Sequence, residues 1–280
     1  MTPINEFNAN QSEYRLWQEK EDSPIIQFYP ASDKKSNAAV IIFAGGGYMI
    51  KTEYEGKVFA EFLSRNGISA FVVDYSVFPK LFPLPLSDAR RSVRFVRYYS
   101  EIFGLDASQI AVMGSSAGGH LAALVSTYRE KIEGEGIDEI DEVCCIPNAQ
   151  ILCYPVISMT DPYLRHEKSR LNFLGEDGLG LSPKVSPNLI ADEKTPQAFI
   201  WHTVEDGSVN VINSYEYASA LRRQNVPVEM HIFPNGHHGL GLCDIFSDTP
   251  DAAKKMRRHT GMWKELLLSW LSYIGYLNLN

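Results

Sequence analysis

The segment Gly114-Ser115-Ser116-Ala117-Gly118 has the residue types and spacing in this sequence that most directly predict chemistry. It follows a short apolar run, 109–113, that predicts a buried strand, and it precedes residues 120–125, which predict an amphipathic helix. A G-x-S-x-G sequence at such a junction forms a turn so sharp that any side chain at the glycine positions would collide with the strand or the helix. The strained turn holds the serine hydroxyl above the N-terminal dipole of the helix. Ser116 is therefore the candidate nucleophile.

A phosphate-binding turn is the main alternative for this glycine- and serine-rich segment. Gly114 and Gly119 have the spacing of a P-loop. However, His120 and Leu121 follow where a P-loop needs the lysine and the serine or threonine that reach phosphate and magnesium. The sequence therefore favours a nucleophile over a phosphate site.

A nucleophilic serine needs a histidine to take its proton and a carboxylate to orient that histidine. Asp206 follows a predicted strand at 197–202, and His238 follows the next predicted strand, at 228–233. Serine, acid and histidine thus occur in the chain order that accompanies a nucleophile elbow. We predict that Ser116, Asp206 and His238 form a catalytic triad.

Neighbouring residues compete for two of these roles. Glu205 adjoins Asp206, and we favour Asp206 because it occupies the loop position directly before Gly207. His237 competes with His238 for the role of the base. Four other histidines are expected outside the triad. His120 and His202 are expected to be packed residues, and His166 and His231 have no assigned partner.

The loop Ala44-Gly45-Gly46-Gly47-Tyr48 supplies the backbone groups that an acyl-transfer site would need. Three successive glycines expose N–H groups and let a substrate carbonyl approach the chain closely. We expect the N–H groups of Gly46, Gly47 and Ala117 to form an oxyanion hole. A dinucleotide-binding loop is the alternative, but Ile50 stands where G-x-G-x-x-G requires a glycine.

Strand-like and helix-like segments alternate along the chain from residue 38, and these segments must position the candidate residues. Strands are predicted at 38–43, 68–75, 109–113, 150–154, 197–202 and 228–233. Helices are predicted at 52–65, 83–103, 120–125, 209–223 and 256–273. This alternation predicts an α/β fold with one doubly wound, mostly parallel sheet that has helices on both faces. In such sheets, sites gather at the carboxyl ends of the strands.

Three other segments carry expectations of their own. Thr52 and Glu55 have the spacing of a capping box that opens a helix. The arginines of the helix at 83–103 are expected on a solvated outer face, and the acidic stretch 130–142 is expected to be a surface connection. The arginines are Arg90, Arg91, Arg94 and Arg97. Residues 159–195 break into short pieces rich in proline and glycine, which predicts a lid-like or substrate-facing insertion.

Composition limits the classes of partner. The chain has 280 residues, 45% of them hydrophobic, and no linker is apparent, so we expect one domain over residues 1–280. A net charge of −8 argues against nucleic acid and against anionic membranes. The sequence shows no signal peptide and no apolar run of 18 residues, which favours a cytoplasmic protein.

The four cysteines do not indicate a metal site or a disulfide framework. They include no C-x-x-C pair and are expected to be small buried hydrophobic residues: Cys144, Cys145, Cys153 and Cys243. No metal and no organic cofactor is expected.

Taken together, these segments resemble the α/β-hydrolase superfamily, and within it the esterases with a G-G-G-Y oxyanion loop, such as bacterial carbohydrate acetylesterases and xylan esterases. The resemblance covers roughly residues 25–275. Besides the loop and the elbow, it is carried by Glu55-Gly56 with Ala60, Asp74-Tyr75, Asp88-Ala89, Ser182-Pro183, Trp201-His202-Thr203 and Gly236-His237-His238-Gly239-Leu240. The catalytic histidine of these families directly precedes a glycine, which implies His238.

The chain departs from the family pattern at two places. Phe43-Ala44 stands where these esterases usually have His-Pro, whose histidine braces the oxyanion loop, and Ser76 stands where arginine is common. Neither departure removes a catalytic group. They leave open how the loop is braced and which substrate is preferred.

The resemblance implies a serine carboxylic-ester hydrolase that forms an acyl-enzyme and cleaves small acyl esters, above all acetyl esters of carbohydrates. The expected partner is a small-molecule ester, and association as a homodimer is left open. Two alternatives remain. One is an amide-directed acyl hydrolase of the same fold, such as a formamidase or a prolyl-peptidase-like enzyme, and the other is a catalytically silent binding protein.

Overall fold

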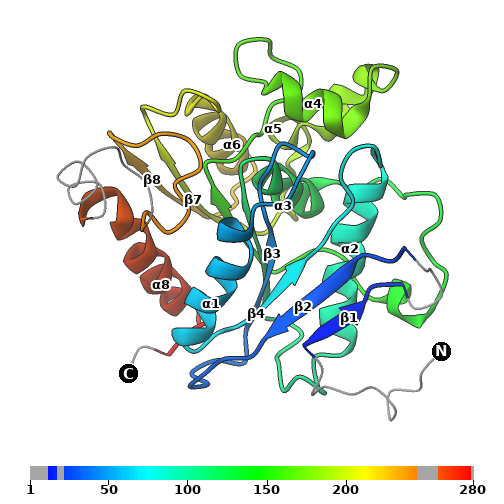
Figure 1. Ribbon diagram of the computed structural model, residues 1–280, viewed down its shortest axis with the longest axis vertical. Coiled ribbons are helices and arrows are strands. Elements are labelled where there is room, and N and C mark those ends of the chain that lie inside the picture. Colours follow the sequence, from blue (N-terminus) through cyan, green and yellow to red (C-terminus); the bar gives the residue numbers. More distant parts are fainter. Residues whose placement is uncertain (1–11, 18–21, 245–257, 279–280) are drawn as a thin grey trace.

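The computed structural model describes residues 12–17, 22–244 and 258–278 (Figure 1). These residues contain an eight-stranded sheet with the strand order β1-β2-β4-β3-β5-β6-β7-β8. The strands are β1 (Glu13–Arg15), β2 (Ile25–Tyr29), β3 (Ala39–Phe43), β4 (Ser69–Val73), β5 (Ile110–Ser115), β6 (Ala149–Cys153), β7 (Gln197–Thr203) and β8 (Val228–Phe233). Strands β3 to β8 are parallel to one another, whereas β2 is antiparallel to both β1 and β4. The predicted doubly wound, mostly parallel sheet is therefore confirmed.

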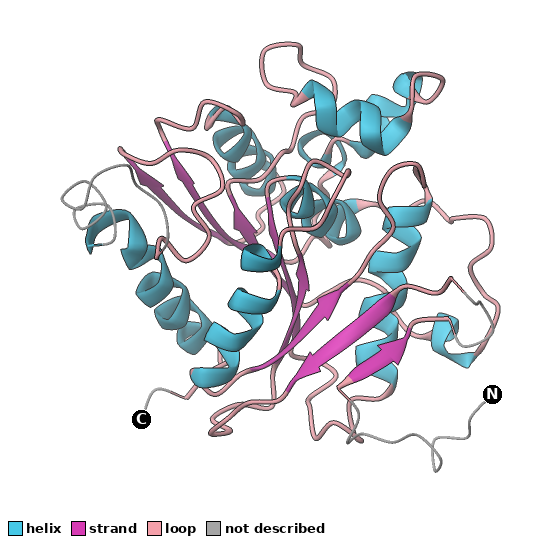
Figure 2. Ribbon diagram, in the orientation of Figure 1, coloured by secondary structure: helices cyan, strands magenta, loops and turns pink. Residues whose placement is uncertain are grey.

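Helices cover both faces of this sheet, as Figure 2 shows. The helices are α1 (Lys57–Arg65), α2 (Leu84–Tyr98), α3 (Ala117–Thr127), α4 (Glu167–Leu174), α5 (Pro187–Ile190), α6 (Ile212–Arg223) and α8 (Trp263–Tyr273). Short 3₁₀ turns are η2 (Glu53–Glu55), η3 (Glu139–Glu142), η4 (Leu179–Val185) and η5 (Thr260–Met262). Residues 256–257 of the predicted last helix lie outside the described residues.

The core divides into two layers because alternate residues of each strand point to opposite faces. Ile41 and Phe43 of β3 pack in the layer that contains α2, α3 and α6. Val40 and Ile42 pack in the layer that contains α1 and α8. Both faces of β3 are fully buried, which is why its sequence is a continuous apolar run.

The apolar patterns predict six of the strands, each within two residues at either end, but they do not predict β1 and β2. These two strands form the antiparallel edge of the sheet. In β2 only Ile26 is fully buried, and its neighbours are half-buried. A short edge strand is stabilised mainly by backbone pairing, so it carries a weak apolar signal.

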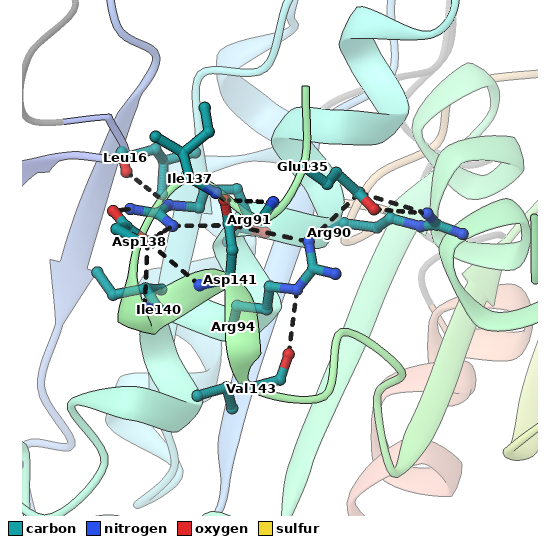
Figure 3. Close-up of polar contacts among 12 residues, drawn as sticks. Leu16, Arg90, Arg91, Arg94, Glu135, Ile137, Asp138, Ile140, Asp141 and Val143 are labelled. Carbon is teal, nitrogen blue, oxygen red and sulfur yellow. Dashed lines mark hydrogen bonds and ion pairs between the residues drawn. The ribbon is translucent and has the colours of Figure 1, made fainter. Parts of the chain in front are cut away.

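The prediction that the arginines of α2 form a solvated face is wrong for Arg90, Arg91 and Arg94, whereas Arg97 is half-buried. The Arg90 and Arg91 side chains are buried and point toward carboxylates of the acidic stretch (Figure 3). Arg90 pairs with Glu135 at 3.1 Å, and Arg91 pairs with Asp141 at 2.9 Å. Arg94 is buried against the same two carboxylates.

The acidic stretch does connect α3 to β6 along the surface, but it also covers these arginines. Several of its residues are exposed, whereas the Glu135 and Asp141 side chains are 5% and 0% exposed. Helical periodicity identified the arginine face correctly. It could not show that a loop some 45 residues later returns to cover that face.

The expectation for the cysteines holds for only two of them. Cys153 and Cys243 are buried, whereas Cys144 is exposed and Cys145 is half-buried. All four are free thiols. Among the described residues, no helix is both long and apolar enough to cross a membrane.

Asp141→Asn is expected to lower the free energy of unfolding by about 3 kcal/mol, because it removes one of the two carboxylates, the other being Asp138, that compensate the buried Arg91 guanidinium. The matched control is Glu61→Gln, which removes the charge of an exposed i,i+4 pair with Arg65 and should cost less than about 0.5 kcal/mol. Urea unfolding of both variants measures the difference. Equal costs would contradict a structural role for the buried pair.

Candidate active site

The candidate residues lie where the order of the strands reverses direction. Strands β3 and β5 are neighbours, yet the chain continues from β3 to β4 on one side and from β5 to β6 on the other. Ligands of open α/β sheets bind at the carboxyl ends of the strands at such a switch point. Residues 44–48 follow β3, and Ser116 follows β5. The glycine loop and the serine are therefore adjacent.

The turn at Ser116 has the strained geometry that the sequence predicts. Ser116 has a φ of 53° and a ψ of −118°, and α3 begins at the next residue. A Cβ atom at Gly114 would lie 2.0 Å from the Gly118 carbonyl oxygen. A Cβ atom at Gly118 would lie 2.0 Å from the Phe43 carbonyl oxygen. Both glycines are therefore required by the close packing of β5, α3 and β3.

The structure brings the three predicted triad side chains into one hydrogen-bonded series. The distance from Ser116 Oγ to His238 Nε2 is 2.8 Å, and the distance from His238 Nδ1 to Asp206 Oδ2 is 2.6 Å. Because a carboxylate accepts only, His238 Nδ1–H donates to Asp206. Nε2 is then free to accept the hydrogen bond of the serine hydroxyl.

Asp206 is buried and held by donors on both of its oxygens. Oδ1 accepts from the backbone N–H groups of Ser208 and Val209, and Oδ2 also lies 3.1 Å from His202 Nε2. Burial alone would raise the pKa of Asp206, but hydrogen bonds from His202 and His238 hold its pKa well below the ordinary value. The carboxylate is therefore ionised at neutral pH.

The residues that compete with Asp206 and His238 make other contacts. Glu205 accepts from Asn235 Nδ2 at 2.8 Å and from the Gly236 N–H at 3.1 Å, so it fixes the loop that carries His238. His237 is exposed, and its Nδ1 donates to the carbonyl of the next residue.

Among the remaining histidines, His202 and His120 are fully buried, as predicted. No sequence pattern indicated that His202 would bond Asp206, because the i,i+4 spacing here joins a strand to the loop that follows it. His231 bonds Glu229 at 2.8 Å across the i,i+2 spacing of β8, a strand pattern that could have been found.

The glycine loop has the conformation that exposes backbone donors. Gly46 and Gly47 have φ values of 131° and 65°, which favour glycine. Within the described ranges, no acceptor takes the N–H groups of Gly46 and Gly47. Nor does one take the N–H of Ala117, the first residue of α3. The three predicted donors are therefore unpaired at the carboxyl ends of β3 and β5.

Side chains from two other segments brace this loop in place of the histidine that the family pattern usually provides. The Tyr75 hydroxyl, after β4, donates to the Ala44 carbonyl at 2.6 Å. Asn172 Nδ2, on α4, donates to the Gly47 carbonyl at 2.8 Å. The loop is thus fixed from both sides.

Tyr48 and His120 join the loop to α3 and to the segment 159–195. The Tyr48 hydroxyl lies 2.7 Å from His120 Nδ1, and His120 Nε2 lies 2.7 Å from the Val185 carbonyl oxygen. The carbonyl can only accept, so Nε2–H donates and Nδ1 accepts from the tyrosine. Burial lowers the pKa of His120 to about 4, and the ring is neutral.

The segment 159–195 forms α4, η4 and α5, which lie at the end of the sheet where β3 and β5 terminate (Figure 1). Its Phe173 ring packs on the Tyr48 ring with a centroid distance of 4.5 Å. His166 caps α4 by accepting the Ser169 N–H at Nδ1, so its Nε2 carries the proton. Burial and the nearby His238 lower the pKa of His166.

The predicted capping box at Thr52 and Glu55 is wrong. Thr52 makes no side-chain cap, and Glu55 ends the 3₁₀ turn η2 before α1 begins. The Thr52 hydroxyl does contact Glu55, donating to its Oε2 at 2.7 Å, but Glu55 is only 2% exposed. The spacing therefore does correspond to a side-chain contact between Thr52 and Glu55, a buried carboxylate beside the glycine loop.

Comparison with known proteins shows that the chain is similar to esterases. Residues 26–221 match the family model described as BD-FAE. Endo-1,4-beta-xylanase B of Butyrivibrio fibrisolvens is 31% identical over 260 residues, which cover 86% of this chain and 39% of that protein. Acetylxylan esterase of Xylanibacter ruminicola is 33% identical over 229 residues, which cover 79% of this chain and 44% of that protein. The chain thus spans less than half the length of these two relatives.

Solved structures match over nearly the whole chain. An acetyl ester-xyloside bifunctional hydrolase from Caldicellulosiruptor lactoaceticus is 37% identical with a TM-score of 0.85, covering 95% of this chain and 97% of that one. The carboxylesterase Cest-2923 from Lactobacillus plantarum has a TM-score of 0.80 at 23% identity, covering 96% and 98% of the two chains. The second likeness is one of fold.

His120 is expected to make the protein less stable in acid. Its folded pKa of about 4 is below the ordinary value near 6.5, so between these pH values the unfolded chain binds more protons and stability falls as the pH falls. Going from pH 7.5 to pH 4.5, the wild-type protein should lose about 2–3 kcal/mol more than His120→Gln, which keeps one donor and one acceptor. Urea unfolding at both pH values measures this. Equal losses would show that the pKa of His120 is the same in the folded and the unfolded chain.

Proposed function

We propose that this chain, which belongs to the BD-FAE family of α/β-hydrolases, is a serine esterase that cleaves small acyl esters, in particular acetyl esters of carbohydrates. The observation that carries the proposal is the series from Ser116 through His238 to the ionised Asp206. The names of two relatives, an acetylxylan esterase and an acetyl ester-xyloside hydrolase, support acetyl esters as the substrate class.

In the first half of the reaction, Ser116 Oγ attacks the ester carbonyl carbon and its proton passes to His238 Nε2. Asp206 stabilises the imidazolium that forms. The negative oxygen of the tetrahedral intermediate accepts hydrogen bonds from the N–H groups of Gly46, Gly47 and Ala117. A donor of this kind typically contributes about 10²–10³ in rate.

In the second half, the intermediate collapses and the C–O bond to the alcohol breaks. The leaving alkoxide takes the proton from His238, and the acyl group stays on Ser116. Water then attacks the acyl-enzyme while His238 accepts its proton. As the second intermediate breaks down, His238 returns this proton to Ser116 Oγ, the C–O bond to the serine breaks and the acid is released. These steps use side chains, backbone groups and water.

The segment 159–195 is proposed to face the substrate as a lid-like insertion within a single domain. Asn172 and Phe173 attach it to the glycine loop. His166 Nε2 carries a proton and is proposed as a donor to a hydroxyl of the alcohol portion, because His238 is near enough to lower the pKa of His166. All eight strands described form one sheet, which supports the single-domain proposal.

Ser116→Ala is expected to lower kcat for p-nitrophenyl acetate by about 10⁶-fold, because the remaining groups cannot form the acyl-enzyme. The control is Ser115→Ala, which removes a hydroxyl from the neighbouring residue, itself fully buried in β5. It should retain most of the activity. Steady-state kinetics on both variants measures the difference, and an active Ser116→Ala variant would contradict the proposal.

The substrate class is tested with a panel that contains acetylated xylosides, N-formyl anilides and dipeptide anilides. Ester cleavage should be the fastest, and all turnover should depend on Ser116. Faster cleavage of either anilide would favour the amide-directed alternative. Binding of the xylosides without any turnover would favour the silent binding protein.

A further inference from the structure

Glu55 is a buried carboxylate that the proposed reaction does not use. Its Oε2 accepts from the Gly45 N–H at 3.1 Å and from the Thr52 hydroxyl at 2.7 Å. Its Oε1 accepts from the Tyr154 hydroxyl at 2.6 Å. Burial raises the pKa of Glu55, and the hydrogen bonds from Tyr154 and Thr52 oppose that rise. A carboxylate buried at this cost and fully bonded needs an explanation.

The glycine loop is built around this carboxylate. A Cβ atom at Gly45 would lie 2.3 Å from Glu55 Oε2, so the glycine leaves the space that the carboxylate fills. The Gly45 carbonyl in turn accepts from the Thr52 N–H at 3.0 Å. Glu55 thus fixes the residue that directly precedes the proposed donors Gly46 and Gly47.

Tyr154 carries the same contact network to the loop that holds His238. Its hydroxyl, while donating to Glu55, accepts from the Gly241 N–H at 3.0 Å. Its ring meets the His238 ring edge-on, with a centroid distance of 5.2 Å and an angle of 71°. Tyr154 has a φ of 37°, a strained value that the fold retains at this position.

From these contacts we propose that Glu55 and Tyr154 are positioning residues, which hold the glycine loop and the His238 ring in place relative to each other. The two loops follow β3 and β8, which lie on opposite sides of the elbow strand β5. Apart from the reacting groups themselves, Glu55 and Tyr154 provide a continuous polar connection between these two loops. The inference rests on the proposed esterase function.

The main test is Glu55→Gln, with Glu53→Gln as the matched control. The Gln amide keeps the size of the side chain. However, its NH₂ group replaces an oxygen that accepts a hydrogen bond in the wild type, so one donor loses its acceptor. Glu53 lies on the same 3₁₀ turn with its side chain 78% exposed. We expect Glu55→Gln to lower kcat for p-nitrophenyl acetate by about 10²-fold with KM changed less than threefold, and Glu53→Gln to change neither.

Tyr154→Phe is a milder variant, because it keeps the ring against His238 and removes only the hydroxyl. It should lower kcat by about tenfold, and it carries the test if Glu55→Gln does not fold. In the double variant the two losses should be far from additive, since the pair acts as one unit. A merely structural role predicts lower stability with kcat per folded molecule unchanged.

The outcomes separate this inference from the proposed function. Wild-type turnover that is abolished in Ser116→Ala but unchanged in Glu55→Gln and Tyr154→Phe would overturn the positioning role alone. Wild-type protein without Ser116-dependent turnover would overturn the proposed function and the inference with it. Circular dichroism and urea unfolding of each variant give the folded fraction used to calculate kcat.

Discussion

The close approach of three backbone segments at Gly114 and Gly118 is the constraint on which the site depends. Neither position has room for a Cβ atom, because carbonyl oxygens of α3 and β3 lie only 2.0 Å from where it would be. This contact forces Ser116 into its strained conformation and sets the start of α3 against the end of β3. The serine, the Ala117 N–H and the glycine loop are adjacent for the same reason.

Around this point, buried polar groups fix the loops that carry the remaining residues. Asp206 is held by backbone N–H groups and by His202, and it holds His238. Glu55 and Tyr154 join the glycine loop to the loop after β8. The hydrogen bonds of Asp206, Glu55 and Tyr154 offset the cost of removing these groups from water.

The sequence predicted those features that local sterics or strand periodicity determine. The elbow glycines, the strands β3 to β8 and the order Ser116, Asp206, His238 belong to this class. Beyond the triad, which the order of its motifs indicated, it did not predict contacts made across the fold. Arg91 meets Asp141 because a later loop returns to α2, and Glu55 meets Tyr154 across 99 residues. Spacing on one helix or strand contains no information about such partners.

The central claim is that Ser116 is the one hydroxyl activated by His238. Treatment of the wild-type protein with a fluorophosphonate, followed by fragment-ion mass spectrometry, tests it most directly, because the reagent traps the attacking oxygen. We expect one phosphonyl group per chain on Ser116, and none in a His238→Ala variant treated for the same time. An adduct on Ser115 or on another residue, or no adduct in the folded wild-type protein, would contradict it.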